Sequence, residues 1–107
     1  MKTLKLNEYT KGWLIGDFEP SVIKTDQFEF SIKKYAKGDK ELRHYHKVAR
    51  EMTVVVTGIF EMNSVLFKEG DIILLEPGEE SIFSCIESGY TAVIKMPSVK
   101  GDKYIIN

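Results

Sequence analysis

Short apolar runs recur along the chain, and none of them has the three-to-four-residue spacing of an amphipathic helix. The clearest pattern is the alternation of Phe28, Phe30 and Ile32 with the polar residues between them. A period of two predicts a half-buried strand. If the apolar side is the buried one, the same register turns Lys34 inward.

Turn signals separate the other apolar runs at short intervals. Pro20, Pro77 and several Gly-containing stretches bound these runs, and Gly58 is predicted to end one strand before the next begins. We therefore expect little or no helix and an all-β sandwich or barrel. Further strands are predicted in the ranges 13–18, 52–56, 59–63, 65–67, 72–75, 81–86 and 91–96.

Length and composition narrow the class of protein. The 107 residues suffice for one domain, and 43% hydrophobic with 29% charged residues is an ordinary soluble balance. No apolar run reaches the ~20 residues that span a bilayer, and the first residues are too polar for a signal peptide. Cys85 is the single cysteine, which excludes an internal disulfide and fits a reducing compartment. A cytoplasmic location is expected.

The formal net charge of -1 gives no reason to expect a nucleic-acid or membrane partner. The charge is nevertheless uneven along the chain. Seven bases and two acids lie between Lys33 and Arg50, whereas six acids and no base lie between Glu69 and Glu87. These stretches are either two solvated surfaces of opposite sign or, for the basic one, a region that attracts an anionic substrate.

The candidate chemistry lies in residues 38–58, where His44 and His46 alternate and Glu51 follows after four residues. Side chains two apart in a strand share a face, so both imidazoles are expected to project to one side. Residues 47–50 are predicted to turn, which lets Glu51 face the histidines from the adjoining strand. Two imidazoles and a carboxylate suit a divalent ion such as Fe, Mn, Ni or Zn.

This segment resembles the first motif of the cupin superfamily, which reads glycine, five residues, His-x-His, three or four residues, Glu, six residues and glycine. Gly38, His44, His46, Glu51 and Gly58 meet it at every position. The resemblance implies a cupin-type jelly-roll β-barrel over residues 1–107, with one divalent metal ion held by the two histidines and the glutamate.

The second cupin motif is degenerate in this chain. Gly70 and Gly78 match its glycines, but Glu76 replaces its proline, Ser81 its metal-binding histidine and Cys85 its asparagine. Two histidines and a carboxylate can still hold a metal and leave more positions open. The alternative is a barrel in which the histidines are hydrogen-bonded pocket residues without a metal.

Other pocket residues follow from strand parity. Ser81 is predicted to hydrogen-bond substrate or bound water, and Phe83 shares its parity and is expected to line the same cavity. Plain core packing is the competing interpretation for Phe83 and for Cys85. A buried thiol among apolar neighbours is a poor nucleophile, because its thiolate is disfavoured.

Three functions remain open on these residues. The first is metal-assisted chemistry on a small polar or anionic metabolite, of the dioxygenase or sugar isomerase and epimerase type that the resemblance implies. The second is a non-enzymatic sensor or binding module, and the third an accessory protein that acts with a partner chain. In the first two, Lys34 is predicted to meet the anionic or oxygen-rich end of the ligand.

A homodimer is also expected, because small cupins commonly pair and a lone barrel leaves strand edges that need covering. The predicted contact is the segment around Trp13, with Leu14 and Ile15, since three consecutive large apolar residues cannot all face one core.

Overall fold

The computed structural model describes residues 1–107, and its regular structure is nearly all β-strand. Two 3-10 turns, η1 (Leu6–Glu8) and η2 (Thr10–Gly12), precede the strands, and no helix is long and apolar enough to cross a membrane. The strands are β1 (Trp13–Gly16), β2 (Ile23–Lys24), β3 (Glu29–Tyr35), β4 (Lys40–His46), β5 (Arg50–Met62), β6 (Val65–Lys68), β7 (Ile72–Leu75), β8 (Ser81–Met96) and β9 (Lys103–Ile105). The all-β prediction is confirmed.

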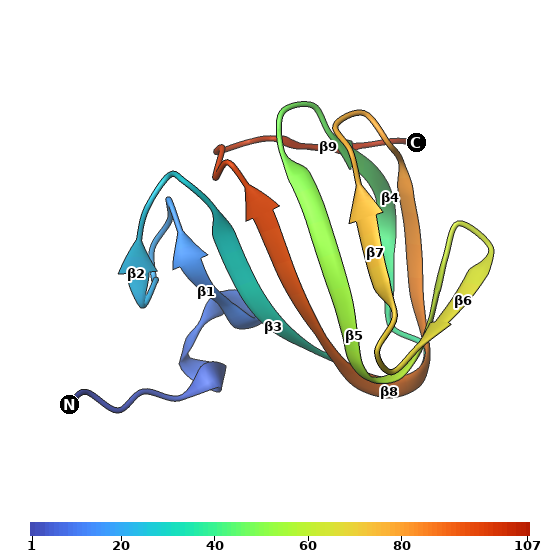
Figure 1. Cartoon of the computed structure of the whole chain (residues 1–107), viewed down its shortest axis with the longest axis horizontal. Helices are drawn as coiled ribbons and strands as arrows, with labels where there is room; N and C mark the ends of the chain where they lie inside the picture. Colours follow the sequence, from blue (N-terminus) through green and yellow to red (C-terminus); the bar gives the residue numbers. More distant parts are fainter.

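All strands belong to one sheet with the order β2-β1-β3-β8-β4-β9, and β5 connects β8 to β7 and β6. Figure 1 shows β7, β5, β8 and β3 side by side as one wall, with β4 and β9 behind it. β3 and β4 follow each other in the chain, yet each pairs with a different end of β8. The barrel therefore has a seam between β3 and β4.

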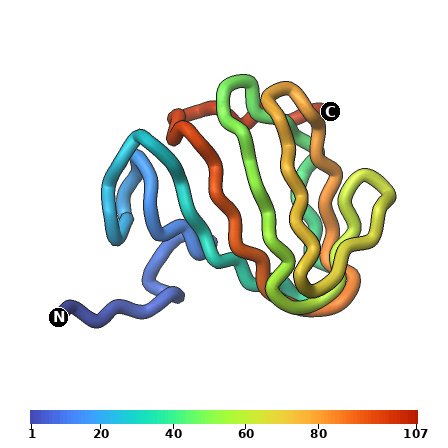
Figure 2. The backbone as a smooth tube through the Cα atoms, in the orientation of Figure 1, coloured from blue at the N-terminus to red at the C-terminus, as the bar shows by residue number.

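The two long strands bend together at a pair of glycines. A Cβ on Gly89 would lie 2.0 Å from the Thr57 carbonyl oxygen, and one on Gly58 would lie 2.7 Å from that of Glu87. Only glycine permits this approach. Both strands curve through this point without ending (Figure 2). The predicted strand ends at Gly58 and in residues 87–89 are thus wrong, because the glycines mark bends within continuous strands.

The apolar core fills the end of the barrel near these bends. Phe60 and Phe83 stack with ring centroids 5.2 Å apart, and Tyr35 meets both rings edge-on. Cys85 packs in the same cluster. The core residues are Val55, Phe60, Met62, Ile73, Leu75, Phe83 and Cys85. The core-packing interpretation therefore describes where Phe83 and Cys85 lie.

The predicted register of β3 is inverted. Ser31 is buried and Lys33 is largely buried on the interior side, whereas Lys34 is exposed on the other. The alternation correctly predicts a strand with two unlike faces, but it does not say which face is inside. Here the interior is the polar side, because it surrounds the candidate site.

The outer face of the same wall is apolar instead. Cross-strand pairing aligns two rows of four residues on it: Leu74, Met52, Ile94 and Phe30 in one row, and Ile72, Val54, Ala92 and Ile32 in the other. Ile72 and Leu74 are the most exposed of these side chains. The segment 13–15, which the sequence offers as a dimer contact, is half-buried, and Trp13 packs edge-on against Phe18.

Candidate functional site

His44 and His46 lie on β4 with both side chains buried, as the alternation predicts. Their ring centroids are 5.3 Å apart. Nδ1 of His44 is 2.7 Å from the Leu42 carbonyl oxygen. A carbonyl oxygen can only accept, so Nδ1 carries the proton and Nε2 keeps the lone pair when the ring is neutral. His44 thus offers one acceptor nitrogen to the interior.

His46 lies between an acid and a base. Its Nδ1 is 3.6 Å from Oε2 of Glu51, and its Nε2 is 3.5 Å from Nζ of Lys95. Burial, together with the nearby Lys95 ammonium, lowers the pKa of His46 to about 4. Burial likewise raises the pKa of Glu51, although Lys95 and Lys33 oppose that effect. His46 is therefore neutral at pH 7.

The predicted metal ligands do not assemble as a metal centre. Glu51 approaches His46 from the adjoining strand, as predicted, but no group of three His, Cys, Asp or Glu side chains is arranged to hold a metal ion. The lone pair on Nε2 of His46 faces the Lys95 ammonium, which donates a hydrogen bond to it. The arrangement of donors does not fit a divalent ion, and metal binding stays a prediction from the motif.

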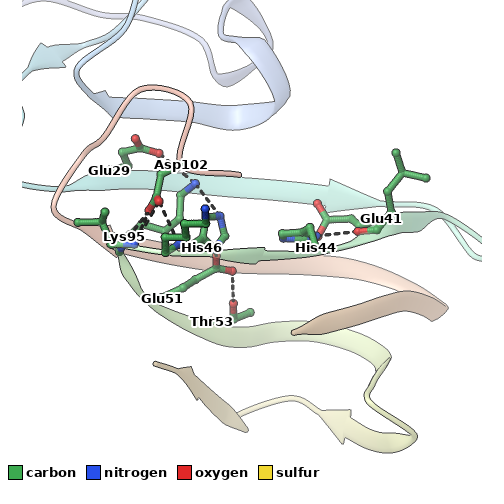
Figure 3. Close-up of polar contacts among 12 residues, drawn as sticks. Glu29, Glu41, His44, His46, Glu51, Thr53, Lys95 and Asp102 are labelled. Carbon is green, nitrogen blue, oxygen red and sulfur yellow. Dashed lines mark hydrogen bonds and ion pairs between the residues drawn. The ribbon is translucent and has the colours of Figure 1, made fainter. Parts of the chain in front are cut away.

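Lys95 on β8 and its acidic partner Glu29 on β3 were not predicted from the sequence. Nζ of Lys95 lies 3.3 Å from Oε1 of Glu29 and 4.9 Å from the centroid of the Trp13 ring. Figure 3 shows Lys95 between Glu29 and His46, with Glu51 below the imidazole. Lys95 shares its parity with the buried Thr91 and Val93, which was the available signal in the sequence.

Asp102 holds the turn after the histidines, a role that was not predicted from the sequence. Its carboxylate accepts the backbone N–H groups of Lys47, Val48 and Ala49 at 2.9 to 3.2 Å. Burial acts to raise the pKa of Asp102, but these three donors hold that pKa below its ordinary value. Asp102 therefore fixes the end of β4 and with it the position of His46.

A second ion pair lies at the seam between β3 and β4. Nζ of Lys33 is 3.4 Å from Oε1 of Glu41 and 4.9 Å from the centroid of the Trp13 ring. Burial acts to raise the pKa of Glu41, but Lys33 and Lys103 hold that pKa below its ordinary value. Burial, followed by the charge of Glu41, raises the pKa of Tyr35. Charged groups thus extend from the interior to the seam.

A cleft of about 880 Å³ opens at this seam, beneath the N-terminal segment. Its walls carry six lysines and only two acids, Asp39 and Glu41. Tyr9, Tyr35 and Tyr90 supply aromatic surface. The space inside the barrel beside Glu51 is only about 10 Å³. A ligand larger than water therefore finds room in the cleft and not beside Glu51. The lysines are Lys5, Lys11, Lys33, Lys34, Lys40 and Lys103.

The predicted substrate residues separate in the structure. Ser81 is buried and pairs with His44 across the β4–β8 ladder. Phe83 lies in the apolar core and touches the small space beside Glu51. Lys34 lines the cleft from the outer face of β3. Their roles toward a ligand stay predictions, with Ser81 beside the histidines and Lys34 in the cleft.

No protein-family profile and no curated protein matches the chain. Among solved structures, a protein with a double-stranded beta-helix domain from Klebsiella pneumoniae aligns over 100% of this chain and 98% of its own, with 17% identity and a TM-score of 0.69. An RmlC-like cupin from Shewanella frigidimarina aligns over 71% of each chain, with 19% identity and a TM-score of 0.64.

A sugar phosphate isomerase of the cupin superfamily from Silicibacter pomeroyi is also similar, with 20% identity and a TM-score of 0.59 over 67% of this chain and 52% of its own. The fold shared with these proteins is the cupin β-barrel. The chain has this fold, and the resemblance predicted from the first motif is confirmed at that level.

Proposed function

We propose that the protein binds a small anionic, oxygen-rich metabolite in the cleft at the seam between β3 and β4. The observation that carries this proposal is the excess of lysine on the walls of the cleft, six against two carboxylates. Glu41 is already paired with Lys33, and Asp39 accepts the backbone N–H of Ala36 at 2.7 Å. Most of the positive charge in the cleft is therefore without an acidic partner.

The crowding of these charges supports an anionic ligand. Burial lowers the pKa of Lys103, and the nearby Lys33, Lys11 and Lys95 lower it further, whereas Glu41 opposes them. A bound anion would relieve this repulsion, and ammonium groups bind phosphate or carboxylate oxygens through charge-assisted hydrogen bonds. The volume of about 880 Å³ lies in the range of small-molecule pockets.

The class of ligand follows from charge, size and aromatic surface together. Three tyrosines offer flat surface and hydroxyl groups to a ring, which favours a phosphorylated sugar or a sugar acid over a bare inorganic anion. One similar structure is described as a sugar phosphate isomerase. Metal-dependent dioxygenase or isomerase chemistry remains a prediction from the motif that no contact in the structure favours.

The test is a binding titration with matched ligands. Isothermal titration of the wild type with glucose 6-phosphate, ribose 5-phosphate and galacturonate, each beside its neutral parent sugar, is expected to show binding by at least one anion and none by the parents. Lys34→Met is expected to weaken that binding at least about fivefold, close to 1 kcal/mol. Lys68→Met, an exposed lysine on β6 outside the cleft, is the control. Equal binding of anions and parent sugars would count against the proposal.

A further inference from the structure

The position of Lys95 follows from the pairing of three strands. Glu51 on β5 and Glu29 on β3 both lie directly opposite Lys95 on β8. Opposite residues of a sheet project to the same face. An acid, a lysine and an acid therefore stand in one row on the interior of the wall, beneath the histidines of β4.

The Lys95 ammonium is held in a defined place within this row. It lies 3.3 Å from Oε1 of Glu29 and 3.5 Å from Nε2 of His46, and its side chain is 15% exposed. Glu29 is fixed in turn, because its Oε2 accepts the Ser98 hydroxyl at 2.7 Å and that hydroxyl accepts the Asp17 N–H. The lysine is thus part of a built network and not a free surface side chain.

The contact with Lys95 uses Nε2, the nitrogen of the neutral His46 ring that has a lone pair to offer a metal. A neutral imidazole has one lone pair, and the ammonium can only donate, so Nε2 of His46 accepts from Lys95. The other nitrogen, Nδ1, faces Glu51 at 3.6 Å and carries the ring proton. A divalent cation placed at Nε2 would also be repelled by the ammonium at close range.

We propose that Lys95 is a built-in cation that occupies the coordination position of His46, so that His44 and His46 bind a divalent metal only when Lys95 is removed. The ion-pair row then replaces the metal as the positive centre of the barrel. This proposal concerns the interior and is independent of ligand binding in the cleft.

The test compares cobalt binding by untagged wild type and Lys95→Ala, using isothermal titration and the visible spectrum of bound Co²⁺. The variant is expected to bind one ion at least about tenfold more tightly than the wild type. Lys95→Ala combined with His46→Ala is expected to lose the gain. Lys33→Ala, which removes another largely buried lysine paired to a glutamate, is expected to gain nothing.

Circular dichroism establishes that each variant is folded. Lys95→Met, which keeps most of the stem and removes only the charge, is the second variant if Lys95→Ala does not fold, and it is also expected to gain affinity. One-to-one binding by the wild type that disappears in His46→Ala overturns the proposal. A folded variant without Lys95 that binds cobalt no better than the wild type overturns it as well.

Discussion

Nζ of Lys95 lies 3.5 Å from Nε2 of His46 inside the barrel, so a positive charge stands beside the imidazole lone pair. Burial and this charge lower the pKa of His46 from 6.5 to about 4. We expect the His46 ring proton signals in NMR to stay constant between pH 8 and pH 5. In Lys95→Met the pKa of His46 is expected to rise. A wild-type midpoint near 6.5 would contradict the contact.

The same shift contributes to the pH dependence of stability. Between pH 6.5 and pH 4 the unfolded chain binds a proton at His46 and the folded chain does not, so stability falls on acidification. The contribution is at most on the order of 3 kcal/mol. Glu51, whose pKa is raised, acts in the opposite sense. Urea unfolding of wild type and His46→Gln at pH 7 and pH 4.5 measures the contribution of His46. The variant is expected to lose less stability than the wild type between these two pH values.

Asp102→Asn tests the anchor of the turn after β4. Both oxygens of the Asp102 carboxylate accept backbone N–H groups. The asparagine amide keeps only one acceptor oxygen, and its N–H₂ group faces the donors that the second oxygen served. We expect a loss of about 1–3 kcal/mol in the free energy of unfolding at pH 7. Asp26→Asn, an exposed aspartate, is the control.

Asp102 stabilises the folded chain only while its carboxylate is ionised. Because the folded pKa of Asp102 is lowered, its contribution is present above the ordinary value of 3.8 and is lost as the pH falls below it. Wild type and Asp102→Asn are therefore expected to converge in stability at the acid end of the titration. A constant difference down to pH 3 would show that ionised Asp102 does not matter.

Thr91→Val is expected to keep or raise stability, by up to about 1 kcal/mol. The Thr91 hydroxyl is buried and has no hydrogen-bond partner, so a methyl group of the same shape removes a desolvation cost. The matched control is Thr53→Val, because the Thr53 hydroxyl donates to Oε1 of Glu51 at 3.5 Å. Thermal unfolding of both variants measures the difference in stability. A larger loss of stability in Thr91→Val than in Thr53→Val would contradict the prediction.

A homodimer remains predicted, with the contact moved to the outer face of β7, β5, β8 and β3. Two aligned rows of apolar side chains cover this face. In a dimer with a two-fold axis, the same face of each copy would be covered by the other copy. Leu74→Lys is expected to give monomers in light scattering. Ile82→Lys is the control, because Ile82 is 54% exposed, as Leu74 is at 53%, but lies outside the two rows. A monomeric wild type at micromolar concentration would contradict the prediction.

The sequence supported the fold better than the site, for reasons visible in particular residues. Five motif positions around His44 and His46 carried the cupin resemblance, and the neighbouring strands predicted at 59–63 and 65–67 do pair with each other. The alternation in β3 could not show which side faces inward, because it gives one apolar and one polar face without saying which of them is buried. The role of Lys95 depends on which strands pair with β8, and that pairing is long-range.

The metal-to-chain ratio of the protein shows whether Lys95 stands in place of a metal ion inside the barrel. Untagged wild type, purified without chelator, is analysed by elemental mass spectrometry. Because Lys95 holds the lone pair of His46, we expect a ratio far below one for iron, manganese, nickel and zinc together. A ratio near one that is lost when His44→Ala and His46→Ala are combined would show that Lys95 does not exclude a metal and would restore the metal centre predicted from the motif.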